Sequence, residues 1–120
     1  MDWHRFQKEA NTDPVLARQG AGSSFRLLLK RGDDEYVIEV REGSVARVHA
    51  GPFVMPQCDF ALAGSRAAWA RFACAHPAPG DQDIFAFFRS GELTLTGDTR
   101  KFYAHLMCLK LVLGHLRFEP

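Results

Sequence analysis

Histidines, which could bind a metal, are the first residues in this chain to test for chemistry. Two imidazoles bind zinc from one helical face when they stand as H-x-x-x-H or H-E-x-x-H. His105 and His115 are ten residues apart, which at about 100° per residue turns their rings away from each other. The others, His4, His49 and His76, are farther apart in sequence. The spacing therefore predicts no metal site and no bound cofactor.

The nucleophile and phosphate-loop motifs are also incomplete. Ser65 stands in A-G-S-R-A and not in G-x-S-x-G, and its place between a strand and a helix is explained by an N-cap. Gly20-Ala21-Gly22 begins like a dinucleotide-binding fingerprint, but a strand follows it and the third glycine is absent. Neither segment predicts catalysis or nucleotide binding.

Carboxylates and tyrosines leave one catalytic alternative open. A small isomerase of the ketosteroid-isomerase kind needs a carboxylate base in an apolar cone, with a tyrosine or a protonated acid for the developing oxyanion. Asp59 or Asp98, with Tyr36 or Tyr103, supplies these residue types. Against this alternative, the chain ends in a helical pattern where those folds end in strands. Asp98 after Gly97 is also explained by a turn and an N-cap. We expect no catalytic residue.

Composition excludes several further classes of function. The chain has 120 residues and a net charge of +1, and its Lys and Arg residues form no run or stripe of the kind that binds nucleic acid. No stretch approaches the roughly 18 apolar residues of a membrane span, and the N-terminus lacks the pattern of a signal peptide. Three distant cysteines, Cys58, Cys74 and Cys108, predict buried thiols in a reducing compartment. We expect one domain, residues 1–120, in the cytoplasm.

Periodicity and turn signals predict a mixture of helices and strands. Trp3, Phe6 and Ala10 form a helical stripe, and the runs after Ser23 alternate between apolar and polar residues. The predicted helices cover residues 3–10, a short segment from Pro14, 66–76 after an N-cap at Ser65, 82–90 after an N-cap at Asp81, and 99–116. The predicted strands cover residues 24–31, 35–41, 44–50, 58–64 and 92–96.

The last predicted helix is more apolar than one buried face requires. Phe102, Leu106, Leu109 and Leu113 form a core stripe at helical spacing. A second apolar side consists of Tyr103, Met107, Leu111 and Val112. A helix that is apolar over most of its circumference is deeply buried, faces a partner or lines a cavity.

Three short motifs in a fixed order bring a family resemblance into view. G-x-V-x-x-V covers residues 43–48, D-x-x-L-x-G-S covers 59–65, and G-x-L-x-L-x-G-D covers 91–98. In this order they resemble the sterol carrier protein domain family, and in particular its small stand-alone bacterial branch. The similarity runs from about Gly22 to Leu113. The segment 76–90 departs from the family pattern, being longer and richer in proline, which alters the expected tunnel mouth.

The resemblance implies an α+β fold in which a five-stranded, mainly antiparallel sheet carries helices on one face around an apolar tunnel. Such domains bind a fatty acyl chain, acyl-CoA or a sterol and perform no chemistry alone. The same apolar surface would also suit an interaction module that forms a homodimer or completes the pocket of a partner enzyme, or it could be plain core. The expected tunnel residues are Trp69, Phe72, Phe85, Phe88, Phe102, Leu106, Leu109 and Leu113.

Overall fold

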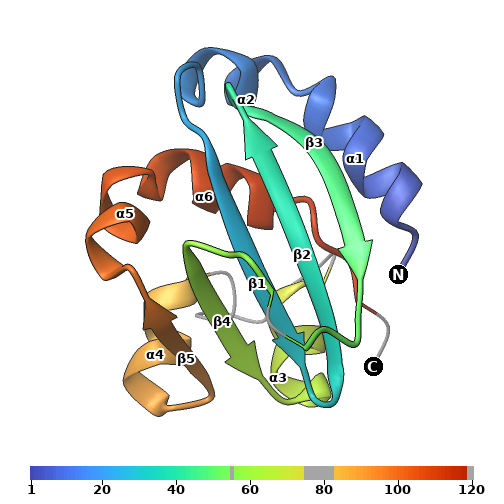
Figure 1. Ribbon diagram of the computed structural model, residues 1–120, viewed down its shortest axis with the longest axis vertical. Coiled ribbons are helices and arrows are strands. Elements are labelled where there is room, and N and C mark those ends of the chain that lie inside the picture. Colours follow the sequence, from blue (N-terminus) through green and yellow to red (C-terminus); the bar gives the residue numbers. More distant parts are fainter. Residues whose placement is uncertain (55, 75–82, 119–120) are drawn as a thin grey trace.

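The computed structural model describes residues 1–54, 56–74 and 83–118, and shows a sheet with helices layered on one face (Figure 1). The helices are α1 (Trp3–Asn11), α2 (Pro14–Gln19), α3 (Arg66–Phe72), α4 (Ile84–Ser90), α5 (Thr99–Ala104) and α6 (Leu106–Leu113). The strands are β1 (Phe25–Arg31), β2 (Asp34–Arg41), β3 (Ser44–Ala50), β4 (Phe60–Gly64) and β5 (Leu93–Gly97).

The sheet has the strand order β3-β2-β1-β4-β5. The first three strands form an antiparallel meander joined by tight turns, and β5 pairs antiparallel with β4. Only the central pair, β1 with β4, is parallel among these strands, because the chain crosses the sheet between β3 and β4. The predicted fold class, an α+β fold with a mainly antiparallel five-stranded sheet and helices on one face, is confirmed.

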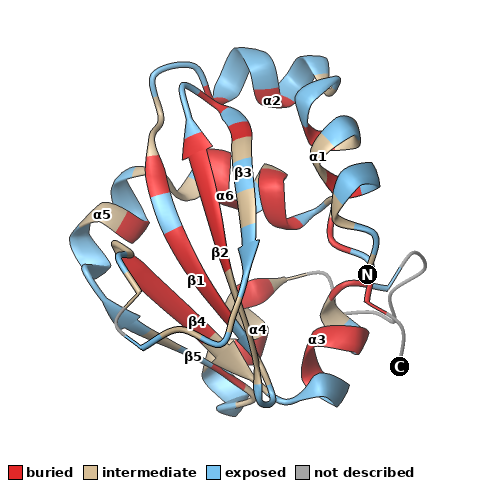
Figure 2. Cartoon of the chain, turned by 45° about the vertical axis from the view of Figure 1, so that its right-hand side comes forward, coloured by how far each residue is buried: buried red, intermediate tan, exposed pale blue. Residues whose placement is uncertain are grey.

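The two faces of the sheet bury different sets of side chains. On the helix side, Phe25, Leu27 and Leu29 of β1 alternate into the main core and are at most 3% exposed. On the other face, Leu28 joins Val37 and Ala61 in a small cluster, which the segment between β3 and β4 covers with Phe53 and Cys58. Figure 2 shows the buried residues running along β1, β2 and β4 and along the inward sides of the helices.

Helix α1 packs beside the edge strand β3 through side-chain amides. Gln7 donates to the carbonyls of Val45 and Ala46 at 3.0 and 3.1 Å. Asn11 accepts from the backbone N–H of Val45 at 2.8 Å and donates to its carbonyl at 3.1 Å. These bonds satisfy backbone groups that an open sheet edge would leave unpaired. They also fix α1 beside the core, where Phe6 and Ala10 are buried.

The predicted last helix is wrong as a single element, because it is divided at His105. α5 ends at Ala104, and His105 has φ −111° and ψ 21°, outside helical geometry. The imidazole of His105 packs on Phe25 of β1 with ring centroids 5.8 Å apart. No glycine or proline marks the break, so the continuous apolar pattern concealed it.

Two further helix boundaries differ from the prediction. α3 ends at Phe72, not at residue 76, and Ala73 is its C-cap; Pro77 disfavours helical geometry in the residue before it, which favours an early end. The N-cap of α4 is Asp83, whose carboxylate accepts from the N–H of Phe85 at 2.9 Å. Asp81, the expected cap, lies outside the described residues.

Candidate functional site

The eight residues expected to line a tunnel all belong to the main core between the sheet and the helices. Trp69, Phe102 and Leu109 are 0% exposed and Leu113 is 1% exposed. Half-buried side chains pack against them from the outer margin of the cluster: Phe72, Phe85, Phe88 and Leu106. The side chains belong to α3, α4, α5 and α6, so four helices converge on one site.

Aromatic contacts hold this cluster together. The ring of Phe102 lies 5.5 Å from that of Phe60 on β4 and 5.9 Å from that of Phe88 on α4. Phe88 is in turn in edge-to-face contact with Phe85 at 5.8 Å. Edge-to-face pairs of this kind stabilise beyond their buried area. The sheet, α4 and α5 are therefore joined by a row of rings.

Trp69 connects α3 to the sheet through a hydrogen bond. Its indole N–H donates to the carbonyl of Lys30 on β1 at 2.9 Å, which satisfies the polar group of a fully buried side chain. Its ring also makes an edge contact with Phe72 at 5.8 Å. The four buried residues, which are at most 1% exposed, form the inner part of the site, and the half-buried side chains form its outer wall.

Asp59 and Asp98, the candidate bases of an isomerase, make hydrogen bonds and an ion pair that stabilise the fold. Asp59 accepts from the backbone N–H of Arg26 at 2.7 Å and pairs with the ammonium of Lys101 at 3.1 Å. Asp98 is exposed and accepts from the backbone N–H of Lys101 at 3.0 Å, as the N-cap of α5. Tyr103 is 57% exposed, and Tyr36 stacks at a tilt on Trp3. Neither Asp59 nor Asp98 stands in an apolar cone, so the geometry does not support an isomerase site.

The structure bears on two further predictions, that of no metal site and that of buried thiols. Among the residues that the structure describes, no group of three His, Cys, Asp or Glu side chains could hold a metal ion; His76 lies outside them. Burial raises the pKa of the Cys108 thiol and, less deeply placed, that of Cys58. Cys74 is exposed, so the prediction of buried thiols is wrong there. The reason is that α3 ends two residues before it.

A cavity that the sequence did not indicate lies between α1, α3 and the segment after α6. It encloses about 580 Å³, and none of the eight expected tunnel residues lines it. Phe118 adjoins both sites, because its ring lines the cavity and lies 6.2 Å from the ring of Trp69. The only sequence signal was a late phenylalanine after the last apolar stripe. The lining is Met1, Asp2, Arg5, Phe6, Glu9, Ala70, Ala73, Cys74, His115, Arg117 and Phe118.

Comparison with known proteins places this architecture. No protein-family model and no curated protein matches the sequence. Among solved structures, a crystal structure of sterol carrier protein 2 aligns over 93% of this chain and 90% of its own, with a TM-score of 0.75 at 12% identity. The chain has the sterol carrier protein fold. This is the fold that the order of its three motifs predicts.

Other solved structures also align with most of this chain. The solution structure of a conserved hypothetical protein of Thermus thermophilus, described as a candidate sterol carrier protein, aligns over 97% of this chain and 86% of its own, with a TM-score of 0.64 at 14% identity. An inverting sec-alkylsulfatase of Pseudomonas aligns over 87% of this chain with a TM-score of 0.57 at 16% identity. This chain spans only 14% of that enzyme's length.

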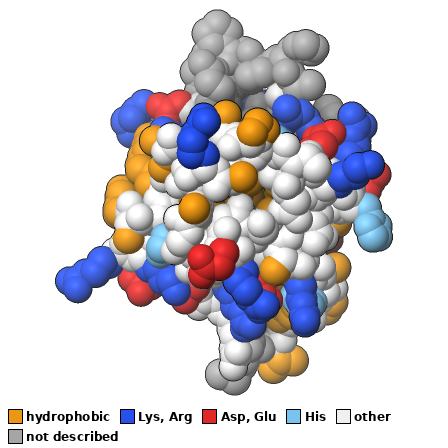
Figure 3. All heavy atoms as spheres, turned by 90° about the horizontal axis from the view of Figure 1, so that it is seen from above, with side chains coloured by type: hydrophobic (Ala, Val, Ile, Leu, Met, Phe, Trp, Pro, Cys, Tyr) orange, Lys and Arg blue, Asp and Glu red, His pale blue; other side chains and the backbone are white. Residues whose placement is uncertain are grey.

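One apolar surface lies outside the core on the last two helices. Tyr103 of α5 is 57% exposed and Met107 of α6 is 59% exposed. The ring of Phe85 stacks on that of Tyr103 with centroids 6.4 Å apart, and the ammonium of Lys110 lies 5.5 Å from the ring of Phe85. Figure 3 shows hydrophobic side chains gathered at the left, the side that carries α5 in Figure 1. No helix in the described part of the chain is long and apolar enough to cross a membrane.

Proposed function

We propose that this chain binds a hydrophobic small molecule between its sheet and its helices, and carries it without chemistry of its own. The ligand is a fatty acyl chain, an acyl-CoA or a sterol-like lipid in an apolar tunnel. The observation that carries the proposal is the convergence of the eight apolar side chains from four helices beneath a sheet of the sterol carrier protein fold. Each of these helices is short, so its apolar surface depends on the shared site.

The eight residues have two roles in this proposal. Trp69, Phe102, Leu109 and Leu113 form the floor, and the half-buried Phe72, Phe85, Phe88 and Leu106 form a wall that moves to admit the ligand. A ligand that enters this site would bury its apolar surface, and this burial would contribute about 25 cal/mol of binding free energy per Å². Flipping a half-buried ring costs little compared with opening the floor, because the floor side chains are close-packed.

The first test is native mass spectrometry of the freshly purified protein, followed by organic extraction. The proposal predicts a bound lipid that is released on denaturation and identified in the extract. If the protein carries none, lipid uptake from added fatty acid, acyl-CoA and fluorescent sterol decides the question. Failure to bind any of them would overturn the proposal.

Two adjacent residues of α6 offer a matched pair of variants. Leu106 is half-buried against the core, whereas Met107 is 59% exposed. Leu106→Arg should abolish lipid uptake by placing a guanidinium at the wall, while the long side chain keeps its head in water and the protein stays folded. Met107→Arg should bind lipid as the unchanged protein does. Equal uptake by both variants would exclude α6 as a wall.

A second candidate function rests on the exposed Tyr103 and Met107. In this candidate, the surface of α5 and α6 packs on a second copy of the chain or on a partner enzyme whose pocket it completes. Native mass decides this directly, because a dimer would appear without lipid. Met107→Arg would then dissociate the dimer, and Leu106→Arg would affect it less, which is the reverse of the order expected for lipid uptake.

A further inference from the structure

The cavity between α1, α3 and the C-terminal segment is built from an apolar floor and a charged rim. Phe6 and Phe118 contribute rings to the floor, and the short side chains of Ala70 and Ala73 on α3 leave its depth open. Trp3 fixes both rings, at 5.3 Å from Phe6 and 6.0 Å from Phe118. The volume of the cavity, about 580 Å³, lies within the range of small-molecule sites. Phe6 is 1% and Phe118 is 4% exposed, so a ligand would meet only a small part of each ring, and the cavity suits a compact apolar body.

The carboxylates of the rim are already engaged. Asp2 accepts from the backbone N–H of Arg5 at 3.1 Å as the N-cap of α1, and Glu9 accepts from the guanidinium of Arg5 at 2.9 Å. His115, also on the rim, lies 2.9 Å from the carboxylate of Asp13. Each negative charge at or beside the cavity therefore has a partner.

Arg117 differs from the other charged groups of the rim. One terminal nitrogen of its guanidinium, Nη1, donates to the carbonyls of Gly114 and Leu116 at 2.8 and 2.6 Å. The guanidinium has no carboxylate partner among the described residues, and its Nε and Nη2 donors make no bond there. Two backbone carbonyls thus hold the guanidinium in place and leave two donor nitrogens, Nε and Nη2, which together can bind a carboxylate in bidentate fashion.

We propose that this cavity is a second binding site, which takes a compact carboxylate with an apolar body. The apolar body enters the cavity beside Phe6 and Phe118, and the carboxylate binds Nε and Nη2 of Arg117. The site is separate from the proposed lipid site, because none of the eight residues of that site lines it. Phe118 links the two sites through its ring contact with Trp69.

The cavity contains its own reporter, the exposed thiol of Cys74. In a Cys58→Ser protein, Cys74 is the accessible thiol, since the remaining cysteine, Cys108, is 1% exposed. The rate of alkylation of Cys74 by iodoacetamide is measured by mass spectrometry with increasing 2-naphthoate, and again with the neutral 2-naphthalenemethanol. The carboxylate should protect Cys74 at a concentration about tenfold lower than the alcohol, as expected for one charge-assisted pair. Equal protection by the two probes, or none by either, would overturn the proposal.

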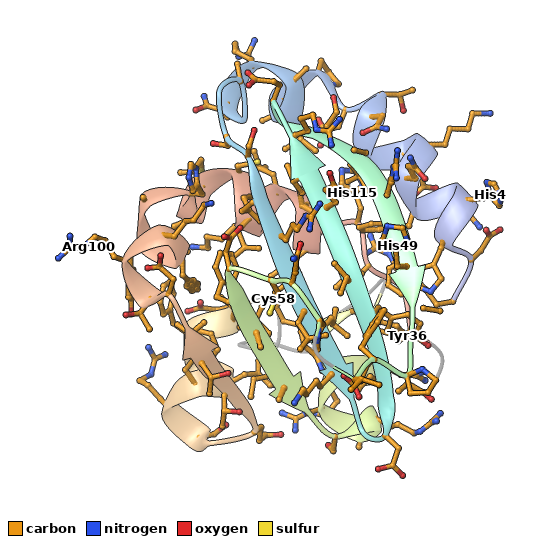
Figure 4. The ribbon with its side chains drawn as sticks, viewed as in Figure 1. His4, Tyr36, His49, Cys58, Arg100 and His115 are labelled. Carbon is orange, nitrogen blue, oxygen red and sulfur yellow. The ribbon has the colours of Figure 1, made fainter. Side chains whose placement is uncertain are left out.

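Variants at two arginines locate the anion contact. Arg117→Gln should remove the advantage of 2-naphthoate over the alcohol, and an unchanged alkylation rate without ligand would show that the cavity is intact. Arg100→Gln is the control, because this side chain is exposed on α5 and points away from the molecule (Figure 4). A preference for the carboxylate that survives in Arg117→Gln would contradict the assignment. So would loss of protection in Leu106→Arg, because the two sites would then be one.

Discussion

Gly97 and Asp98 turn the chain from β5 into α5, and each residue meets a separate requirement. Gly97 has φ +97°, and a Cβ there would lie 2.8 Å from the Cα of Phe60 and 2.9 Å from the carbonyl oxygen of Asp59. Only glycine combines that backbone conformation with so close an approach. Asp98 then caps α5. The turn at Gly97 and Asp98 therefore has a structural role, and Asp98 does not stand in the apolar surroundings that the base of an isomerase needs.

Gly97→Ala is expected to destabilise the protein by about 2 kcal/mol or more, since it adds left-handed strain to a clash with backbone atoms. Gly91→Ala is the matched control. Gly91 has φ +79° but nothing within 4 Å of the added Cβ, so strain alone should cost about 1 kcal/mol. Urea unfolding of the two variants measures the difference. Equal losses would show that the contact with Phe60 relaxes freely.

Asp98→Ala should lower the free energy of unfolding by about 1 kcal/mol, the usual effect of losing an N-cap. Asp98→Asn retains an acceptor for the N–H of Lys101 and should be close to the unchanged protein. Neither variant should alter lipid uptake. A strong loss of uptake or of activity in Asp98→Asn, without a loss of stability, would instead give this carboxylate a functional role.

At the scale of elements, α2 depends on contacts outside itself. It has six residues, too few to be stable alone. Asp13 caps it by accepting from the N–H groups of Val15 and Leu16, at 2.9 and 3.3 Å, and its other oxygen lies 2.9 Å from Nε2 of His115. One aspartate thus joins the start of α2 to the chain just after α6. The hydrogen bond from His115 is the main reason that the pKa of Asp13 is lowered.

Asp13→Asn tests this link, because asparagine caps a helix about as well as aspartate but carries no charge. A carboxyl whose pKa is lowered by folding stabilises the protein above its unfolded pKa, near 3.9, and the effect fades as the pH falls through the folded pKa. The variant should therefore be less stable at pH 6, and the difference should shrink below about pH 4. Urea unfolding across this range measures it. A difference that stays constant at acid pH would mean that the charge of Asp13 contributes nothing.

Local patterns in the sequence predicted most elements and the order of the motifs predicted the fold. Alternation indicated the strands of the meander, and Ser65 and Asp98 are helix N-caps in the structure, as the cap signals indicated. These signals are local and depend on backbone groups a few residues away. The eight core residues also follow from helical periodicity, although whether they admit a ligand depends on side-chain motion that periodicity does not describe.

What the sequence did not show depends on contacts between distant residues. Glu39 alternates with the core-facing side chains of β2, a position that favours exposure to solvent, yet it is only 7% exposed. Burial alone would raise the pKa of Glu39, but the hydrogen bond from Arg41 and the charges of Arg26, Arg41 and Arg47 hold it below its ordinary value. The cavity beside Arg117 likewise needs three segments that are far apart in the chain. No local pattern marks either feature.

Over the whole molecule, the two proposed sites differ in what drives binding. The site between the sheet and the helices is apolar, and its ligand would be held by burial of apolar surface. The cavity at Arg117 adds one cation that is open to solvent. We expect that both can be occupied together, because none of the eight residues of the first site lines the cavity. Charge therefore enters the binding free energy at one site and not at the other.

Ionic strength separates the two sites in the same protein sample. Raising the salt from about 50 to about 500 mM shortens the Debye length from roughly 14 to roughly 4 Å and screens exposed ion pairs. Binding of a neutral long-chain alcohol in the apolar site should not weaken over this range, since water is still excluded from the same surface. Protection of Cys74 by 2-naphthoate should need a several-fold higher concentration, because its carboxylate pairs with a solvent-exposed guanidinium. A steep salt dependence at the apolar site would point to an anionic head group there as well, and salt-independent protection of Cys74 would show that the ring alone holds the second ligand.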